Sequence, residues 1–91
     1  MIFVKKLVLD VLKPHQPNAL DFAKAITATG DDYWVRVTVL EVDEQTETLE
    51  LEVSGSAVDF ELIRQSVTEQ GGSVHSIDEV VVENERQATA E

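Results

Sequence analysis

The chain has 91 residues, with 18 acidic and seven basic side chains, no cysteine and a formal net charge of -11. This length fits a single domain, and the absence of thiols excludes disulfides and thiolate metal sites. The acidic balance disfavours nucleic acids and anionic membranes as partners, whereas oligomerisation and oxygen-ligated metal ions stay open.

Residues 2–13 alternate aliphatic and mixed positions, which predicts a β-strand that Pro14 ends. Leu7, Leu9 and Val11 form its inward face, and the opposite face also carries apolar groups, as a central strand would. The chain enters this strand without a signal peptide, and no segment reaches the roughly 18 apolar residues of a membrane span. We therefore expect a cytoplasmic protein.

A rigid connector over residues 14–17 leads to Asn18, which we expect to cap a helix over residues 19–29. Phe22, Ala23 and Ile26 recur at helical spacing and form its buried stripe, and Gly30 is expected to end it.

Two strands follow, over residues 33–42 and 47–53, and both alternate cleanly. The polar segment 43–46 between them predicts a turn, so the two strands form a hairpin. A second helix is predicted over residues 59–70, with Phe60, Ile63 and Val67 inward and a glycine pair at its end.

Residues 73–82 complete the domain as a last strand, and residues 83–91 read as an acidic, disordered tail. The domain therefore spans residues 1–82 in the order βαββαβ. This order predicts an α+β, ferredoxin-like sandwich, in which an antiparallel sheet of order 4-1-3-2 carries two helices on one face.

The motifs LVLDVLKPHQP (7–17) and GGSVHSIDEVV (71–81) resemble the DUF211 family, small and mostly archaeal proteins of unknown function. The resemblance covers about residues 4–82 and implies a ferredoxin-like fold and assembly into closed rings. It implies no catalytic mechanism. The chain departs from the archaeal pattern in its longer acidic tail and lower lysine content, which leaves ring size open.

Four carboxylates are expected to converge on the sheet face opposite the helices, because antiparallel pairing brings the neighbours of the central strand beside Asp10. They are Asp10, Glu50, Glu52 and Asp78. Hard oxygen ligands of this kind suit Ca²⁺ or Mg²⁺. The alternatives are salt bridges to Lys6 and Arg36, which point to the same face, and simple solvation.

Two further candidate groups lie at the sheet surface. The sheet order brings the end of the first strand near the start of the last, so His15 and His75 could pair as metal ligands or simply close a loop. One of Tyr33 and Trp34 must face away from the helices. Together with its neighbours, such an aromatic predicts an apolar interface, formed by Trp34, Val8, Leu12 and Leu40.

No nucleotide-binding loop, nucleophile elbow or zincin helix is present in the sequence. The expected function is therefore a non-enzymatic module that assembles with copies of itself, as a ring-like homo-oligomer, and holds a divalent cation or small ligand at the seam between subunits. The alternative is a sensor of amino acids like the ACT domains, which share the layout. A small enzyme is the third interpretation.

Overall fold

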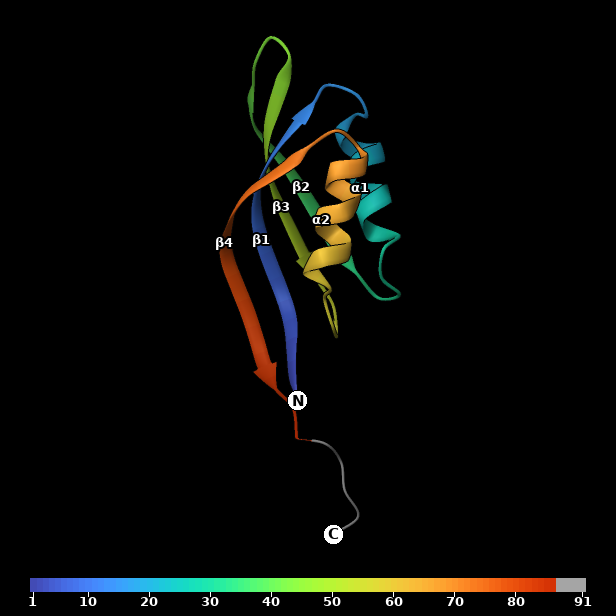
Figure 1. Cartoon of the computed structure of the whole chain (residues 1–91), viewed down its shortest axis with the longest axis vertical. Coiled ribbons are helices and arrows are strands. Elements are labelled where there is room, and N and C mark those ends of the chain that lie inside the picture. The colour runs from blue at the N-terminus through green and yellow to red at the C-terminus, as the bar shows by residue number, and fades with distance from the viewer. Residues whose placement is uncertain (87–91) are drawn as a thin grey trace.

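The computed structural model describes residues 1–86. The elements run in the order β1 (Ile2–Pro14), α1 (Ala19–Thr27), β2 (Trp34–Val42), β3 (Thr46–Ser54), α2 (Phe60–Glu69) and β4 (Ser73–Asn84). The four strands form one antiparallel sheet of order β2-β3-β1-β4, and both helices cover one face of it (Figure 1). This confirms the predicted α+β fold, because 4-1-3-2 is the same order read from the other edge.

β1 is the central strand and organises the sheet. It pairs with β3 from Lys6 to Pro14 and with β4 from Ile2 to Leu12. Its alternation decides which side chains face the helices: Leu7, Leu9 and Val11 are buried there, as predicted. The hydrophobic core that they begin is completed by Phe22, Ile26, Leu49, Leu51, Val53, Val58, Ile63 and Val67.

The helix ends follow the capping residues of the sequence. Asn18 caps α1 by accepting a hydrogen bond from the Asp21 backbone N–H at 2.8 Å, and Asp59 caps α2 by accepting one from Leu62 at 3.2 Å. α1 ends two residues earlier than predicted. The next backbone bonds, from Thr29 to Ile26 and from Gly30 to Thr27, have the tighter three-residue spacing of a 3₁₀ turn.

Two glycines are required by the fold at the ends of the helices. Gly71 follows α2 with φ of 88°, a left-handed conformation that glycine adopts without steric cost. Gly30 follows α1, and the ring of Tyr33 occupies the space where a side chain would begin. Tyr33 can therefore pack against the core, while its neighbour Trp34 faces the other side of the sheet.

β4 runs to Asn84, two residues beyond the predicted strand end. Residue 85 is also held, because the Glu85 N–H donates to the Met1 carbonyl at 2.8 Å and the Glu85 carboxylate pairs with Lys5. The rest of the predicted tail, residues 87–91, lies outside the described residues. Neither helix within residues 1–86 has the length and apolar run needed to cross a membrane.

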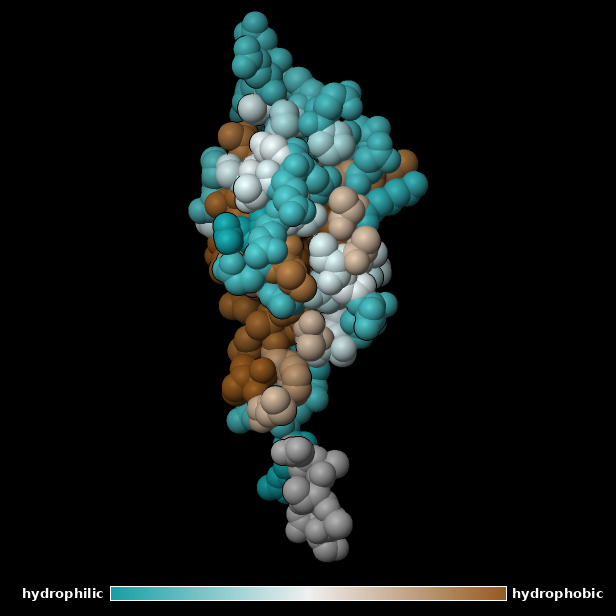
Figure 2. All heavy atoms as spheres, turned by 45° about the vertical axis from the view of Figure 1, so that its right-hand side comes forward, coloured by the Kyte–Doolittle hydropathy of each residue, from teal (hydrophilic) through white to brown (hydrophobic). Residues whose placement is uncertain are grey.

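The N-terminal end of β1 and the C-terminal end of β4 project beyond the helix layer as a two-stranded arm, in which residues 2–4 pair with residues 82–84 (Figure 1). Val82 lies opposite Val4 and Val80 opposite Leu7, so both valines share the helix-facing side of the sheet. Both lie on the edge strand β4, and they are 56% and 51% exposed. Figure 2 shows the resulting hydrophobic surface below the helices.

Candidate functional site

A ladder of opposite charges crosses the sheet face opposite the helices. The Arg36 guanidinium of β2 donates to Glu52 of β3 at 2.9 Å, and Lys6 of β1 lies 3.7 Å from Glu52 and 2.8 Å from Glu79 of β4. The hydrogen bond from Arg36 holds the pKa of the Glu52 carboxyl below its usual range, with Lys6 adding to the effect. Glu52 is thus paired with cations of this chain, which is the salt-bridge alternative of the sequence analysis.

The remaining predicted carboxylates are only partly brought together. Asp10 lies directly opposite Glu50 on β3, as expected, but opposite Ser76 on β4. Asp78 sits where the β1–β4 register shifts, and its carboxylate accepts a hydrogen bond from the Ser76 hydroxyl at 2.6 Å. Within residues 1–86, no group of three or more histidines and carboxylates is arranged to hold a metal ion.

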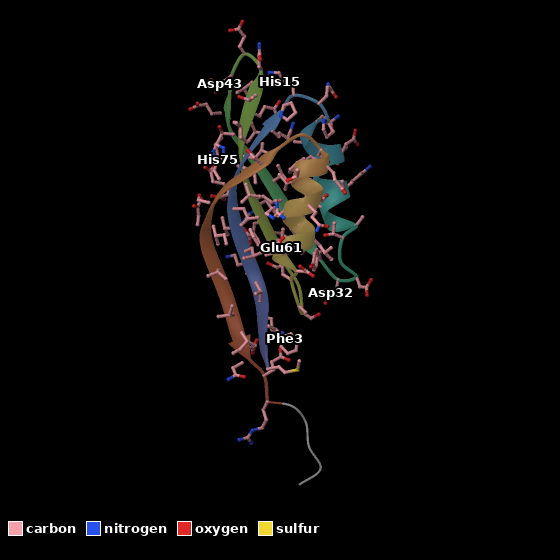
Figure 3. All side chains as sticks on the ribbon, in the orientation of Figure 1. Phe3, His15, Asp32, Asp43, Glu61 and His75 are labelled. Carbon is pink, nitrogen blue, oxygen red and sulfur yellow. The ribbon has the colours of Figure 1, made fainter. Side chains whose placement is uncertain are left out.

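The two histidines have different partners and lie in different places (Figure 3). His75 is on β4, with its Nδ1 4.0 Å from the Asp10 carboxylate. His15 lies on the connector after β1, where Nδ1 is 3.0 Å from Glu47 Oε2 and Nε2 is 3.0 Å from the Glu44 carbonyl. Both ring nitrogens of His15 are therefore engaged by protein groups and are not free to bind a metal ion.

Lys13 is the least expected feature of this region. It continues the inward alternation of Leu7, Leu9 and Val11, and its side chain is fully buried. Its ammonium donates to the carbonyls of Pro14 at 2.8 Å and Pro17 at 2.6 Å, and it lies 3.0 Å from Glu47 Oε1. Three N–H groups thus meet three acceptors, which is what a buried ammonium requires.

Lys13, His15 and Glu47 form a clamp that joins the connector to the β2–β3 hairpin. One carboxylate oxygen of Glu47 serves Lys13 and the other serves His15. The hydrogen bond from His15, followed by that from Lys13, lowers the pKa of the Glu47 carboxyl. The same bond to Glu47, helped by the Glu44 carbonyl, raises the pKa of the His15 ring above 6.5.

The predicted interface residues divide into exposed and covered ones. Trp34 and Leu40 are 53% and 60% exposed, and the Trp34 ring carries the Arg36 guanidinium 5.5 Å from its centroid. Leu12 is half-buried. Val8 is only 7% exposed, because it lies between Glu52 and Glu79, which Lys6 bridges; the exposed patch therefore does not include Val8.

A cavity of about 400 Å³ lies at the opposite end of the helices, beside the loops that follow α1 and β3. Two of its three acidic side chains already serve the fold. Asp32 accepts from the Ser56 N–H at 3.2 Å, Asp59 caps α2, and the Tyr33 hydroxyl accepts from the Asp59 N–H at 2.7 Å. Hydrogen bonds from Ser56 lower the pKa of the Asp32 carboxyl. These contacts close the two loops upon each other and form no reactive pair.

Sequence reasoning missed Lys13 and Glu47 as a pair. The signal for Lys13 was present, since a fourth position in the alternation Leu7, Leu9, Val11 must also point inward. A lysine at an inward position needs a buried acceptor. Which acceptor it finds depends on the register that places Lys13 opposite Glu47.

Comparisons with known proteins agree with the resemblance seen in the sequence. Residues 5–88 match the family model DUF211, described as Uncharacterized ArCR. An uncharacterized protein of the archaeon Methanocaldococcus jannaschii is 40% identical over 78 residues, which cover 86% of this chain and 80% of that protein. Neither description names a ligand, a reaction or an assembly.

Proposed function

The chain belongs to the DUF211 family, and on that premise we propose that it is a non-enzymatic module that assembles with copies of itself through the two edges of its sheet. The observation that carries the proposal is the position of the exposed large apolar side chains. Of the 12 such side chains in residues 1–86, four lie on β2 and four on β4, the two edge strands. They are Trp34, Val39, Leu40, Val42, Ile77, Val80, Val81 and Val82.

Apolar edge strands favour association because they carry both unpaired backbone groups and exposed apolar side chains. An edge strand presents backbone N–H and C=O groups that can pair with another strand. Clustered exposed valine, leucine and tryptophan side chains gain free energy when a partner removes them from water. A domain of this size also has a modest core of its own, so shared burial adds stability.

The two edges differ, and this difference favours head-to-tail contact. β2 carries Trp34 beside a cation, whereas β4 carries a run of aliphatic residues ending in the arm. When β2 of one copy meets β4 of the next, every subunit uses both edges. Such a heterologous contact closes into a ring if the rotation between copies allows it and otherwise continues as a filament.

We further propose that a divalent cation or small ligand binds at the seam between subunits. Asp10 and Glu50 face each other across β1 and β3 on the open face, and carboxylate oxygens suit Ca²⁺ or Mg²⁺. Two carboxylates are too few for six to eight ligands, so waters or a copy packed on the open face would supply the remaining oxygens. Because Asp10 and Glu50 lie on the two central strands, a copy that reaches them packs on the open face and not at the sheet edges.

The test of assembly is the particle mass in moderate salt, measured by light scattering across a range of protein concentrations. The parent chain should scatter as a multiple of its 10.1 kDa. Trp34→Ala and Val82→Ser should shift the distribution toward monomer. Leu20→Ala is the matched control, because Leu20 is 63% exposed but lies on α1 and not on an edge strand. A 10.1 kDa particle at every concentration overturns the proposal.

Calorimetry with Ca²⁺ and Mg²⁺, on the parent chain and on Asp10→Asn, tests whether a cation binds at Asp10. Binding that is lost in the variant and in dissociated protein supports a cation site between subunits. A thermal shift with one amino acid and none with either cation would favour the ACT-like sensor alternative.

A further inference from the structure

The connection between the β2–β3 hairpin and the connector after β1 depends on a titratable ring. Residues 43–45 form the hairpin turn, and Figure 3 shows Asp43 and His15 together at this end of the molecule. The turn closes on itself through the Asp43 N–H, which donates to the Thr46 carbonyl at 2.8 Å. Among the hydrogen bonds of residues 1–86, the one from His15 to the Glu44 carbonyl joins this turn to a segment outside the hairpin.

The two contacts of His15 require two ring protons. A neutral imidazole has one N–H donor and one acceptor nitrogen, whereas the imidazolium has two donors. Both ring nitrogens of His15 face acceptors at 3.0 Å, the Glu47 carboxylate and the Glu44 carbonyl. Neither partner can donate a proton in return, so only the imidazolium makes both hydrogen bonds.

We propose that Lys13, Glu47 and His15 form a proton-operated latch that holds the hairpin turn against the connector while His15 is protonated and releases it when the ring loses a proton. Lys13 and Glu47 are the fixed part of this latch. The buried ammonium of Lys13 orients the Glu47 carboxylate, so that its second oxygen faces His15 in either protonation state.

The groups that face His15 all favour the charged ring. They are the Glu47 carboxylate from β3 and the backbone carbonyls of the turn at Glu44 and Asp43. The nearby cation, Lys13, is already paired with Glu47 and two carbonyls. Because these contacts raise the pKa of His15 in the folded chain, the stabilisation by the latch is complete below about pH 6.5 and is lost as pH rises through the folded value.

Loss of the proton leaves one contact without a donor. If Nδ1 keeps its hydrogen for Glu47, the lone pair of Nε2 faces the Glu44 carbonyl and the turn is pushed away. If Nε2 keeps it, the lone pair of Nδ1 faces a carboxylate held in place by Lys13. The first tautomer is preferred because a hydrogen bond to a charged acceptor is the stronger one, and it releases the turn. The proposal does not depend on self-assembly, because every group in it belongs to one chain.

Nuclear magnetic resonance on the parent chain, His15→Gln and His75→Gln tests the latch between about pH 5 and pH 9. The parent should show His15 titrating above 6.5, with both ring nitrogens protonated below the midpoint. Across the same midpoint, protection of the Asp43 amide, corrected for intrinsic exchange, should fall roughly three- to tenfold, as expected for a partly exposed charge-assisted bond.

His75→Gln is the matched control, because it removes the other histidine and leaves the turn untouched; the step in Asp43 protection should persist. In His15→Gln the step should vanish, because glutamine does not titrate. A step that persists in His15→Gln overturns the proposal. So does a parent His15 that titrates at or below its ordinary value, a measurement that needs no variant to fold.

Discussion

The hairpin end of the sheet and the β1–β4 arm at the other end differ in how far their side chains are satisfied within one chain. At the hairpin end a lysine, a glutamate and a histidine come together, and every polar group of the clamp has a partner within the chain. At the arm, the Val82 side chain faces the helix side and is 56% exposed. One end is complete within a single copy, while the other leaves apolar surface in water (Figure 2).

The contrast comes from one strand. β1 has 13 residues, whereas α1 and α2 have nine and ten. A strand rises about 3.3 Å per residue and a helix only 1.5 Å, so the helices cannot cover the whole length of β1. The chain satisfies the Lys13 end with polar contacts and leaves the end at Ile2 uncovered. The following predictions test whether the first end serves the fold and the second serves association.

The largest effect is expected for Lys13→Met at the hairpin end. This change leaves the Glu47 carboxylate and two backbone carbonyls without their shared donor, and breaking a buried pair costs about 3–5 kcal/mol. The free energy of unfolding, from urea denaturation, measures the loss. Lys24→Met is the control on exposed α1 surface and should cost less than about 1 kcal/mol. Equal losses in the two variants would show that the clamp does not support the fold.

A pair of truncations then compares the core with the arm. Leu9→Ala removes a fully buried side chain of β1 and should lower the free energy of unfolding by about 2–5 kcal/mol. Val82→Ala, at a 56% exposed position, should cost about 0.5 kcal/mol or less in dilute protein. In concentrated protein the cost should grow if the arm becomes buried between copies. A cost that does not change with concentration would place Val82 outside any interface.

The decrease in the free energy of unfolding at acidic pH should depend on Glu47. Its pKa is lowered by His15 and Lys13, so its contribution is present above about 4.5 and is lost as pH falls through the folded value. In Glu47→Gln the decline of the unfolding free energy between about pH 5 and pH 3 should be shallower than in the parent. Glu44→Gln keeps the carbonyl that His15 uses and should follow the parent curve. A parent-like slope in Glu47→Gln would contradict this assignment.

A moderate effect on the melting temperature is expected from salt. The net charge of -11 produces self-repulsion that ions screen, and the Debye length falls to about 3 Å at molar salt. We expect a melting temperature higher by about 4–8 °C, equivalent to roughly 1 kcal/mol for a domain of this size. Calorimetric scans from low to molar salt provide the measurement. A flat or falling profile would indicate that pairs such as Arg36–Glu52 already balance the repulsion.

The elements could be predicted because their signals are local. Alternation predicted the strands and the inward face of β1, and Asn18 and the glycine pair marked helix ends that the structure confirms within two residues. The end of β4 was missed because residues 83–84 carry no apolar period, and their place in the strand depends on pairing with Ile2 and Phe3. Local pattern alone does not reveal such pairing.

The candidate sites show where prediction from sequence ends. Strand order was enough to bring Asp10 beside Glu50, but the register of β1 against β4, which shifts between Val8 and Leu9, decided that Ser76 and not Asp78 lies opposite Asp10. The low exposure of Val8 within one chain has a related reason, since the charged side chains of Glu52 and Glu79 lie on both sides of it. Bulges and side-chain bridges between distant strands leave no local signal in a single sequence.

The sequence by itself determined the class of fold, the order of its elements, its acidic surface and its membership of a family, because periodicity, composition and motifs are properties of the chain alone. Only the tertiary structure decided that His15 bonds to the hairpin and does not pair with His75, that Lys13 is buried and fully bonded, and that the arm lies beyond the helices. These outcomes depend on strand register and on the different rise of strands and helices, which act only when distant segments pack together.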